Sequence, residues 1–186
     1  MPRAGLSPDV LVDEAARLVD EADGERLTLS ALAKRFDVAQ PSLYKHVDGL
    51  DGLNRLLTVR VLREVGDTMR RACTGKAGAE AVGALAAAYR AYALAHPGRY
   101  HYMLRAPDVG DTAWEEAAAE ILSVFDDVFA GFGITGTDAI DAARFLRSSL
   151  HGFVSLELGG GFGKPQSIDT SFRRLVAASI HALQAW

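Results

Sequence analysis

The segment 28–47 constrains the fold more than any other part of the chain, because its apolar residues fall at helical spacing on both sides of a break at Asp37. These apolar positions are Leu29, Leu32, Ala33 and Phe36 before the break and Leu43 and Val47 after it. The spacing predicts two short amphipathic helices, with Thr28 as the N-cap of the first, and Ala33 is small enough to let them cross closely. The segment therefore predicts a helix-turn-helix, whose second helix enters the major groove of DNA with its N-terminus first.

The remainder of the chain also shows helical periodicity and no strand pattern. Further helices are expected over about 50–73, over Arg99–Leu104, from Thr137 to about Leu158, and after a cap at Ser167–Thr170. We therefore predict an all-α fold of about nine helices. A three-helix helix-turn-helix domain would occupy residues 1–48 and a larger helical domain residues 49–186, with the helix over about 50–73 linking the two.

The exposed face of the second short helix, expected over Gln40–His46, carries polar side chains suited to DNA. Glutamine can bond bidentately to adenine, whereas lysine and histidine can reach phosphates or guanine. The formal net charge is −4, so DNA binding needs a local basic face rather than a basic chain. The nearby residues that could supply backbone contacts are Lys34, Arg35, Arg55 and Arg60. From spacing alone, a helical hairpin with a solvated polar face is an equal alternative.

The motif Val38–Val47 resembles the DNA-binding domain of the TetR family. The resemblance implies that the residues from Gln40 to His46, apart from Leu43, face DNA, with the helix start reading bases and the tyrosine and histidine touching phosphate. The predicted DNA-binding residues are Thr28, Lys34, Gln40, Pro41, Ser42, Tyr44, Lys45 and His46. The sequence departs from the family pattern at three positions, with Asp37 in place of the turn glycine, Ala39 in place of a serine or threonine cap, and Leu50 in place of a phosphate-binding lysine.

The motifs Ala95–Tyr100 and Leu150–Glu157 resemble the ligand-binding domain of a TetR subgroup that carries a His-Gly motif. The resemblance implies that the last two helices form a four-helix bundle with a second copy. A row of small residues, including Gly159, would permit close approach, although the same row could pack inside one subunit. The predicted interface residues are Ser148, Gly152, Ser155, Phe172, Val176 and Ile180.

Aromatic residues of the larger domain could line a pocket for an effector, although most of them are equally suited to the core. The predicted ligand-binding residues are Tyr89, Tyr92, Tyr100, Tyr102, Met103, Phe125, Phe129 and His151. Arg105 and Arg147 are the charged residues nearest to them in the pattern, and no carboxylate clearly lies on these stripes. We therefore expect an apolar or aromatic effector that is neutral or weakly acidic.

Other functional classes find little support in the sequence. Neighbouring carboxylates such as Glu115-Glu116 point to different helix faces and so do not form a catalytic pair. A nucleophile and base could come from Ser148-Ser149 and His151, but no acidic orienting residue accompanies them. We therefore expect no enzyme. The histidines lack metal-ligand spacing, so neither a metal nor another cofactor is expected. No apolar run could span a bilayer, and a single cysteine, Cys73, fits the cytoplasm.

The most plausible function is a ligand-responsive repressor. It would bind a palindromic DNA operator as a homodimer and be released by a small effector. The alternative is a small-molecule-binding or interaction protein of the same fold that has lost DNA binding.

Overall fold

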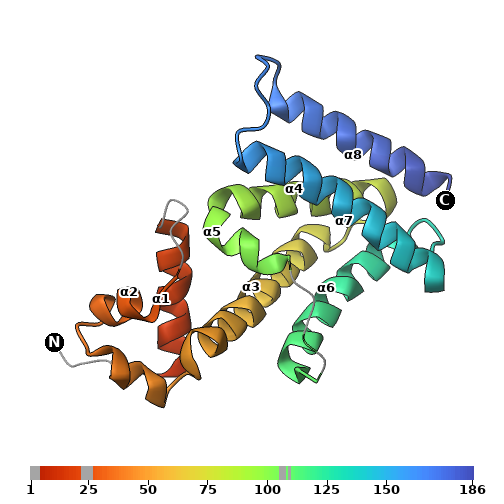
Figure 1. The fold of residues 1–186 in the computed structure, drawn as a ribbon. Coiled ribbons are helices and arrows are strands. Elements are labelled where there is room, and N and C mark those ends of the chain that lie inside the picture. The colour runs from red at the N-terminus through yellow and green to blue at the C-terminus, as the bar shows by residue number, and fades with distance from the viewer. Residues whose placement is uncertain (1–4, 22–26, 105–107, 109) are drawn as a thin grey trace. The chain divides into compact units, whose positions relative to one another are not determined.

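The computed structural model describes residues 5–21, 27–104, 108 and 110–186, and within these residues it contains helices and no strand. The helices are α1 (Pro8–Glu21), α2 (Leu29–Arg35), the 3₁₀ helix η1 (Gln40–Lys45), α3 (Gly49–Cys73), α4 (Gly78–Ala95), α5 (Pro97–Tyr100), the 3₁₀ helix η2 (His101–Met103), α6 (Thr112–Ala130), α7 (Gly136–Leu158) and α8 (Ile168–Gln184) (Figure 1). The predicted all-α fold of about nine helices is confirmed.

The described residues form two compact units. The first, the N-terminal unit, draws on Met1–Leu62 and His96–Glu116, and the second, the larger unit, on Arg63–Ala95 and Ala117–Trp186. These boundaries differ from the expected division at residue 48, because the first half of α3 and the short helices α5 and η2 pack with the N-terminal helices. A functional division into residues 1–48 and 49–186 remains a prediction.

Helix α1 is the central element of the N-terminal unit. Its start is capped by Ser7, whose Oγ lies 3.3 Å from the backbone nitrogen of Val10. Its apolar residues repeat at helical spacing, which gives one buried face against its neighbours. The buried residues of α1 are Leu11, Val12, Ala15, Ala16 and Val19.

Helix α5 lies against α1 with almost no space between the two backbones. A Cβ atom placed on Gly98 would lie 1.8 Å from the carbonyl oxygen of Val19, so no other residue fits at position 98 without movement of the backbone. The Asp20 carboxylate holds the same contact together, because it accepts a hydrogen bond from the Arg99 backbone nitrogen at 3.0 Å and lies 3.0 Å from the His96 ring nitrogen Nδ1. The segment that was predicted as one helix over Arg99–Leu104 is divided between α5 and η2.

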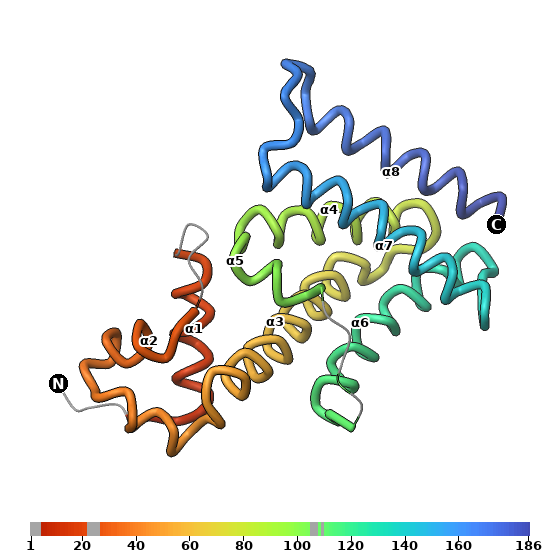
Figure 2. Tube along the Cα trace, in the orientation of Figure 1, coloured from red at the N-terminus to blue at the C-terminus, as the bar shows by residue number. Residues whose placement is uncertain are grey.

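Helices α4, α7 and α8 of the larger unit each contact the other two, as the tube in Figure 2 shows. Their shared core includes Leu85 of α4, Leu146 and Leu150 of α7 and Leu183 of α8, each at most 1% exposed. Burial of such leucine side chains contributes about 1.5–3 kcal/mol each. Packing of these apolar faces therefore stabilises this layer.

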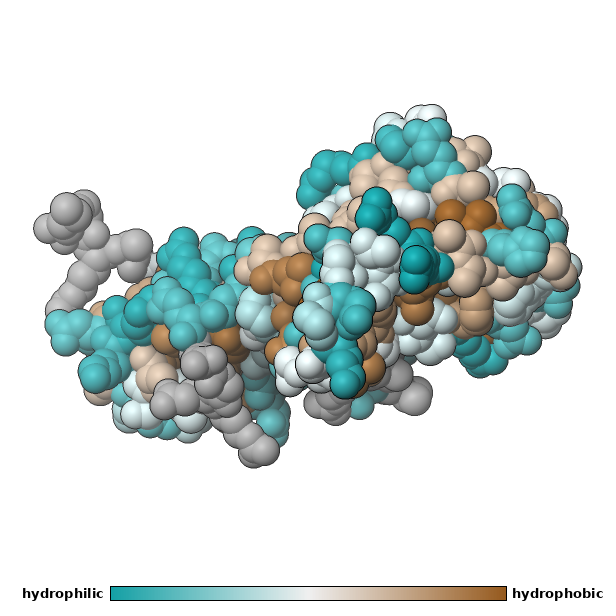
Figure 3. Space-filling view, turned by 90° about the horizontal axis from the view of Figure 1, so that it is seen from above, coloured by the Kyte–Doolittle hydropathy of each residue, from teal (hydrophilic) through white to brown (hydrophobic). Residues whose placement is uncertain are grey.

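Apolar side chains also reach the surface. Figure 3 shows brown atoms in patches between teal and pale ones on the visible face. The large exposed apolar residues of the longer helices include Leu94, Leu122, Ile140 and Leu156. Among the helices that the structure describes, none combines the length and apolarity needed to cross a membrane.

Candidate functional site

The helix-turn-helix is formed by α2, a tight turn and η1. Thr28 caps α2, its hydroxyl oxygen accepting a hydrogen bond from the Ala31 backbone nitrogen at 3.1 Å. Asp37 has a φ of +51°, in the left-handed region that favours glycine but that aspartate tolerates better than most residues. The Val38 nitrogen then donates to the Ala33 carbonyl at 3.1 Å and closes the turn. The predicted cap and the predicted turn are therefore both present.

The second element of the motif is a 3₁₀ helix rather than the expected α-helix. Ala39 occupies its N-cap without a side-chain hydrogen bond, and Pro41 has no N–H to donate. The backbone instead forms bonds between residues three apart, such as the 2.9 Å bond from the Ser42 nitrogen to the Ala39 carbonyl. The missing cap therefore coincides with a tighter winding of this element.

Burial divides η1 into an inner and an outer face. Leu43 is completely buried and Val47, just beyond the helix, is 5% exposed. Gln40, Pro41, Tyr44 and Lys45 are exposed, whereas Ser42 and His46 are partly buried. The aromatic side chain of Tyr44 is 55% exposed. The residues predicted to read DNA thus lie on the outer face, over a firmly packed inner face.

The arginines near this face do not present free charges. Arg35 donates from Nε to Glu14 at 2.6 Å and pairs through Nη2 with Glu21 at 3.0 Å. The hydrogen bonds to Glu14 and Glu21 raise the pKa of Arg35 above its ordinary value. Burial acts to raise the pKa of Glu14, but its hydrogen bonds from Arg35 and Arg17 outweigh this and hold the pKa below the usual range. Arg35 therefore links α2 to α1 through these ion pairs.

Two further arginines of α3 are also paired. Arg60 lies 3.0 Å from the Asp13 carboxylate, and Arg55 forms a bidentate pair with Asp111. The hydrogen bond from Arg55 lowers the pKa of Asp111, more than burial raises it. The phosphate contacts predicted for Arg35, Arg55 and Arg60 would therefore require each arginine to leave or share a carboxylate.

Lys34 and Lys45 differ from these arginines. Both side chains are exposed, and neither has a carboxylate within ion-pair distance in the described part of the chain. Sequence reasoning missed the acidic face of α1 that pairs the arginines. The spacing of seven between Glu14 and Glu21, which places both on one helix face, was a signal that could have revealed it.

The predicted ligand-binding residues are divided between the two units. Tyr100, Tyr102 and Met103 belong to the N-terminal unit. The members in the larger unit are Tyr89, Tyr92, Phe125, Phe129 and His151. All of these are buried except Tyr102 and His151, which are partly buried. Phe125 and Phe129 contact each other, with ring centroids 5.9 Å apart.

The tyrosine hydroxyls have polar partners that the sequence did not reveal. Tyr92 donates to the Glu64 carboxylate at 2.9 Å, so the expectation that no carboxylate lies near these residues is wrong. Glu64 lies on α3, 28 residues before Tyr92, a separation at which periodicity carries no information. Tyr102 donates to the Asn54 side chain at 3.1 Å, and burial raises the pKa of Tyr102. Arg147 is exposed, and Arg105 lies outside the described residues.

The two serines of the rival enzyme hypothesis form hydrogen bonds within their own helix. The hydroxyls of Ser148 and Ser149 both donate to the Phe145 carbonyl, at 3.0 and 2.9 Å, so each is used as a backbone partner within α7. In this geometry their hydroxyl hydrogens are not donated to a base, as activation of a serine nucleophile requires. No group of three or more metal-ligating side chains lies together among the described residues.

A family model described as the C-terminal domain of tetracyclin repressor-like proteins matches residues 82–179, more than half of the chain. The chain belongs to the TetR family. This TetR-family chain is 38% identical over 162 residues to the HTH-type transcriptional regulator Rv0681 of Mycobacterium tuberculosis (strain ATCC 25618 / H37Rv), a match that covers 84% of this chain and 72% of the relative. The resemblance seen in the sequence is confirmed.

The comparison with solved structures is consistent with membership of this family. The regulatory protein SCO4313 is 29% identical and superposes with a TM-score of 0.73 over 96% of this chain and 95% of that one. ActR from Streptomyces coelicolor, crystallised in complex with (S)-DNPA, is 17% identical and superposes with a TM-score of 0.72 over 98% of each chain. By its family and its fold, this TetR-family chain is a transcriptional regulator.

The predicted interface of this TetR-family chain divides into an exposed row and more buried members. Ser148, Gly152 and Ser155 of α7 are exposed, and a Cβ atom on Gly152 would meet nothing within 4 Å. The row is therefore not covered by the rest of the chain. On α8, Val176 and Ile180 are partly buried, while Phe172 is buried, its ring 5.2 Å from that of Phe153.

Proposed function

We propose that the chain is a ligand-responsive transcriptional repressor that binds a palindromic operator as a homodimer. The observation that carries the proposal is the outer face of η1, where Gln40, Tyr44 and Lys45 are exposed over the buried Leu43. Gln40 and Tyr44 lie within contact of each other, with the amide nitrogen 3.5 Å from the phenol oxygen. In this proposal Gln40 and Pro41 meet base edges, while Tyr44, Lys45 and His46 meet phosphates.

The remaining predicted DNA contacts belong to α2. Lys34 would meet a phosphate with its exposed ammonium group. Thr28, whose hydroxyl oxygen already caps α2, could still donate its hydroxyl hydrogen to a phosphate oxygen. Residues 1–48 would then be the DNA-binding part.

The homodimer would form through α7 and α8. The exposed row Ser148, Gly152 and Ser155 allows the backbone of a second copy to approach closely. A two-fold arrangement places two copies of η1 on the half-sites of a palindrome, with centres about 34–36 Å apart or a multiple of this spacing. Phe172, Val176 and Ile180 of α8 would complete this interface.

The effector would be a small molecule bound by residues 49–186. The crystallised complex of ActR with (S)-DNPA supports ligand binding on this fold. Tyr89, Tyr92, Phe125, Phe129 and His151 remain the proposed contacts within the larger unit. An effector that binds the non-DNA conformation better weakens DNA binding by the same factor by which DNA weakens effector binding.

The proposal is tested by selecting bound duplexes from a random library and from the DNA that flanks the gene. We expect a palindromic consensus that the wild type binds and that Tyr44→Ala with Lys45→Ala binds at least tenfold more weakly. Arg17→Ala is the matched control, because Arg17 is exposed on α1 and should leave binding unchanged. The absence of any enriched sequence at low salt would contradict the proposal.

A second candidate is a ligand-binding protein of the same fold that has lost DNA binding. The pairing of Arg35, Arg55 and Arg60 with carboxylates favours it, because it removes positive charge from the N-terminal unit. The same selection distinguishes the two candidates, since this one predicts effector binding with no enriched duplex.

A further inference from the structure

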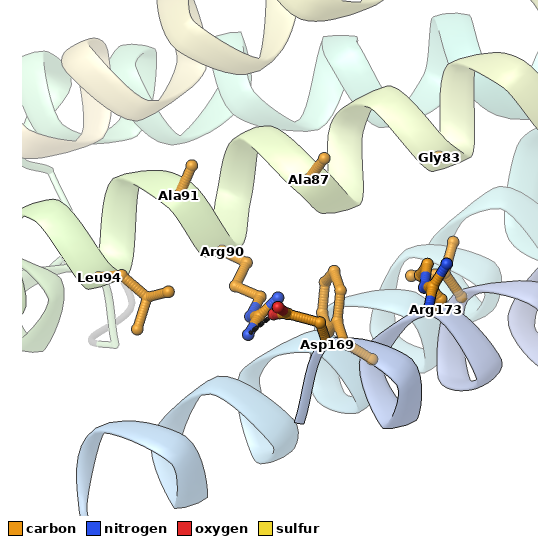
Figure 4. A pocket seen from close by; sticks show the side chains of 9 residues that line it. Gly83, Ala87, Arg90, Ala91, Leu94, Asp169 and Arg173 are labelled. Carbon is orange, nitrogen blue, oxygen red and sulfur yellow. Dashed lines mark ion pairs between the residues drawn. The ribbon is translucent and has the colours of Figure 1, made fainter. Parts of the chain in front are cut away.

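A surface groove runs between α4 and α8 of the larger unit, with a volume of about 480 Å³. This volume is large enough for a small organic molecule, although the groove is an open surface hollow rather than an enclosed pocket. The residues that line the groove are Gly83, Ala87, Arg90, Ala91, Leu94, Asp169, Phe172, Arg173 and Val176 (Figure 4). None of them belongs to the aromatic set predicted to bind ligand, whereas Phe172 and Val176 also belong to the predicted dimer interface, so the groove borders that interface.

Small residues create the hollow. Gly83, Ala87 and Ala91 follow one another at four-residue spacing along one face of α4, as Figure 4 shows. Ala87 and Ala91 are exposed, and Leu94 beyond them is 44% exposed. A solvated helix face normally carries polar side chains. This part of α4 therefore has the composition of a covered face, although the described chain leaves it open.

Two arginines line the groove, Arg90 from α4 and Arg173 from α8, and Figure 4 shows the Arg173 side chain apart from the Arg90–Asp169 pair. Arg90 extends from α4 toward α8 and donates to Glu157 at 2.7 and 2.6 Å, while its Nη2 lies 2.7 Å from Asp169. The Arg90 guanidinium also lies over the Phe172 ring, 4.8 Å from its centroid. Glu157 and Asp169 differ sharply, because the side chain of Glu157 is 12% exposed and that of Asp169 is 77% exposed.

This difference makes Asp169 the replaceable partner of Arg90. An ion pair with so exposed a carboxylate contributes little, because water screens it. Arg173 follows Asp169 by one turn of α8, and its Nη2 donates to the Thr170 hydroxyl at 3.0 Å. Within the described residues Arg173 has no carboxylate within ion-pair distance. The groove thus offers one unpaired guanidinium and a second whose outer partner can leave.

We propose that the α4/α8 groove binds a small organic acid with an apolar body. The carboxylate takes the place of Asp169 on Arg90, and Arg173, which lines the same groove, adds a second positive charge. The apolar body covers Ala87 and Ala91 and contacts the edge of Phe172. Binding here does not require DNA, so the inference goes beyond the proposed function and can fail without it.

The experiment uses the full chain with its alanine methyl groups labelled with carbon-13, because Ala87 and Ala91 report directly from the groove. The probes are 4-phenylbutyrate, 4-phenylbutanamide and 4-phenylbutylammonium, which share one body and differ in charge. We expect saturable shifts of these two methyl signals with the acid, at an affinity at least tenfold above those of the amide and the amine. Absence of saturable shifts up to about 5 mM acid, a range that covers weak millimolar binding, would overturn the proposal.

Three variants and one control sharpen the test. Asp169→Asn removes the competing carboxylate and should strengthen binding of the acid severalfold without affecting the amide, whereas Arg173→Gln should weaken only the acid. Ala87→Leu should fill the groove and abolish binding. Ala79→Leu, at an exposed position in the first turn of the same helix, should leave binding intact.

Three results would refute the assignment. The first is equal affinity for all three probes. The second is unchanged acid binding in a folded Ala87→Leu protein. The third is saturable acid binding that appears only on dilution to the monomer, which would show that a second copy of the chain covers the groove in the dimer.

Discussion

The contrast between paired arginines and unpaired lysines predicts which cations set the salt dependence of DNA binding. Lys34 and Lys45 are exposed and lack a carboxylate partner among the described residues, whereas Arg35 and Arg60 are held by carboxylates of α1. Each phosphate that a cation neutralises on B-DNA adds about 0.9 to the slope of log affinity against log salt. We therefore expect Lys45→Ala to flatten the slope of a homodimer by about 1.8, since the variant removes one contact from each copy.

The effect is large enough to measure. Two lysines in each copy account for a slope of about 3.6, so between 50 and 200 mM salt they cause a loss of affinity on the order of 150-fold. Without Lys45 this part of the loss falls to about 12-fold. Lys34→Ala should have the same effect as Lys45→Ala.

The assay is fluorescence anisotropy on the selected duplex at several potassium chloride concentrations. Arg60→Ala is the matched control, because it removes a positive charge that is already compensated by Asp13. Its slope should stay within about 0.5 of the wild type. If Arg60→Ala flattens the slope as much as Lys45→Ala does, the arginines leave their carboxylates for phosphate, and the argument from pairing is refuted.

Three other changes give independent tests of the fold and the proposed function. Gln40→Ala should relax base preference at one position of each half-site by about 1–3 kcal/mol of discrimination, and an unchanged consensus on repeated selection would contradict base reading by this residue. Gly98→Ala should lower the thermal stability of the N-terminal unit, because its Cβ atom would lie 1.8 Å from the Val19 carbonyl oxygen, and a calorimetric midpoint equal to that of the wild type would exclude this close contact. Gly152→Leu should weaken self-association in sedimentation without loss of helix content, since no part of the same chain approaches this position, and a variant that dimerises like the wild type would place the interface elsewhere.

Local chemistry made much of the fold predictable from the sequence. The Thr28 cap, the left-handed turn at Asp37 and the burial of Leu43 all depend on residues within a few positions of one another. Periodicity likewise gave α3 its extent, predicted as about 50–73 and observed as Gly49–Cys73. The winding of η1 was not predicted, since the choice between three- and four-residue hydrogen bonding depends on small differences in energy at the uncapped Ala39.

Contacts between distant residues were beyond the reach of sequence patterns. Arg55 and Asp111 are 56 residues apart, and Tyr92 is 28 residues from Glu64. No helical or turn rule links such positions, and each pair forms only because several helices pack in a particular order. The pairing of polar and charged side chains in the candidate site, rather than the arrangement of its helices, was therefore the part that could not be predicted from the sequence.

The contact of Gly98 with Val19 limits how this joint can change in evolution. The backbones of α1 and α5 are in direct contact there. The distance between the two helices is therefore set by backbone atoms, which every amino acid has. A substitution of the Val19 side chain leaves the carbonyl oxygen of that residue in place, so it does not change the distance between the two helices. As long as Gly98 is kept, divergent descendants could change the strength of this connection only through the polar side chains beside it, Asp20, His96 and Arg99.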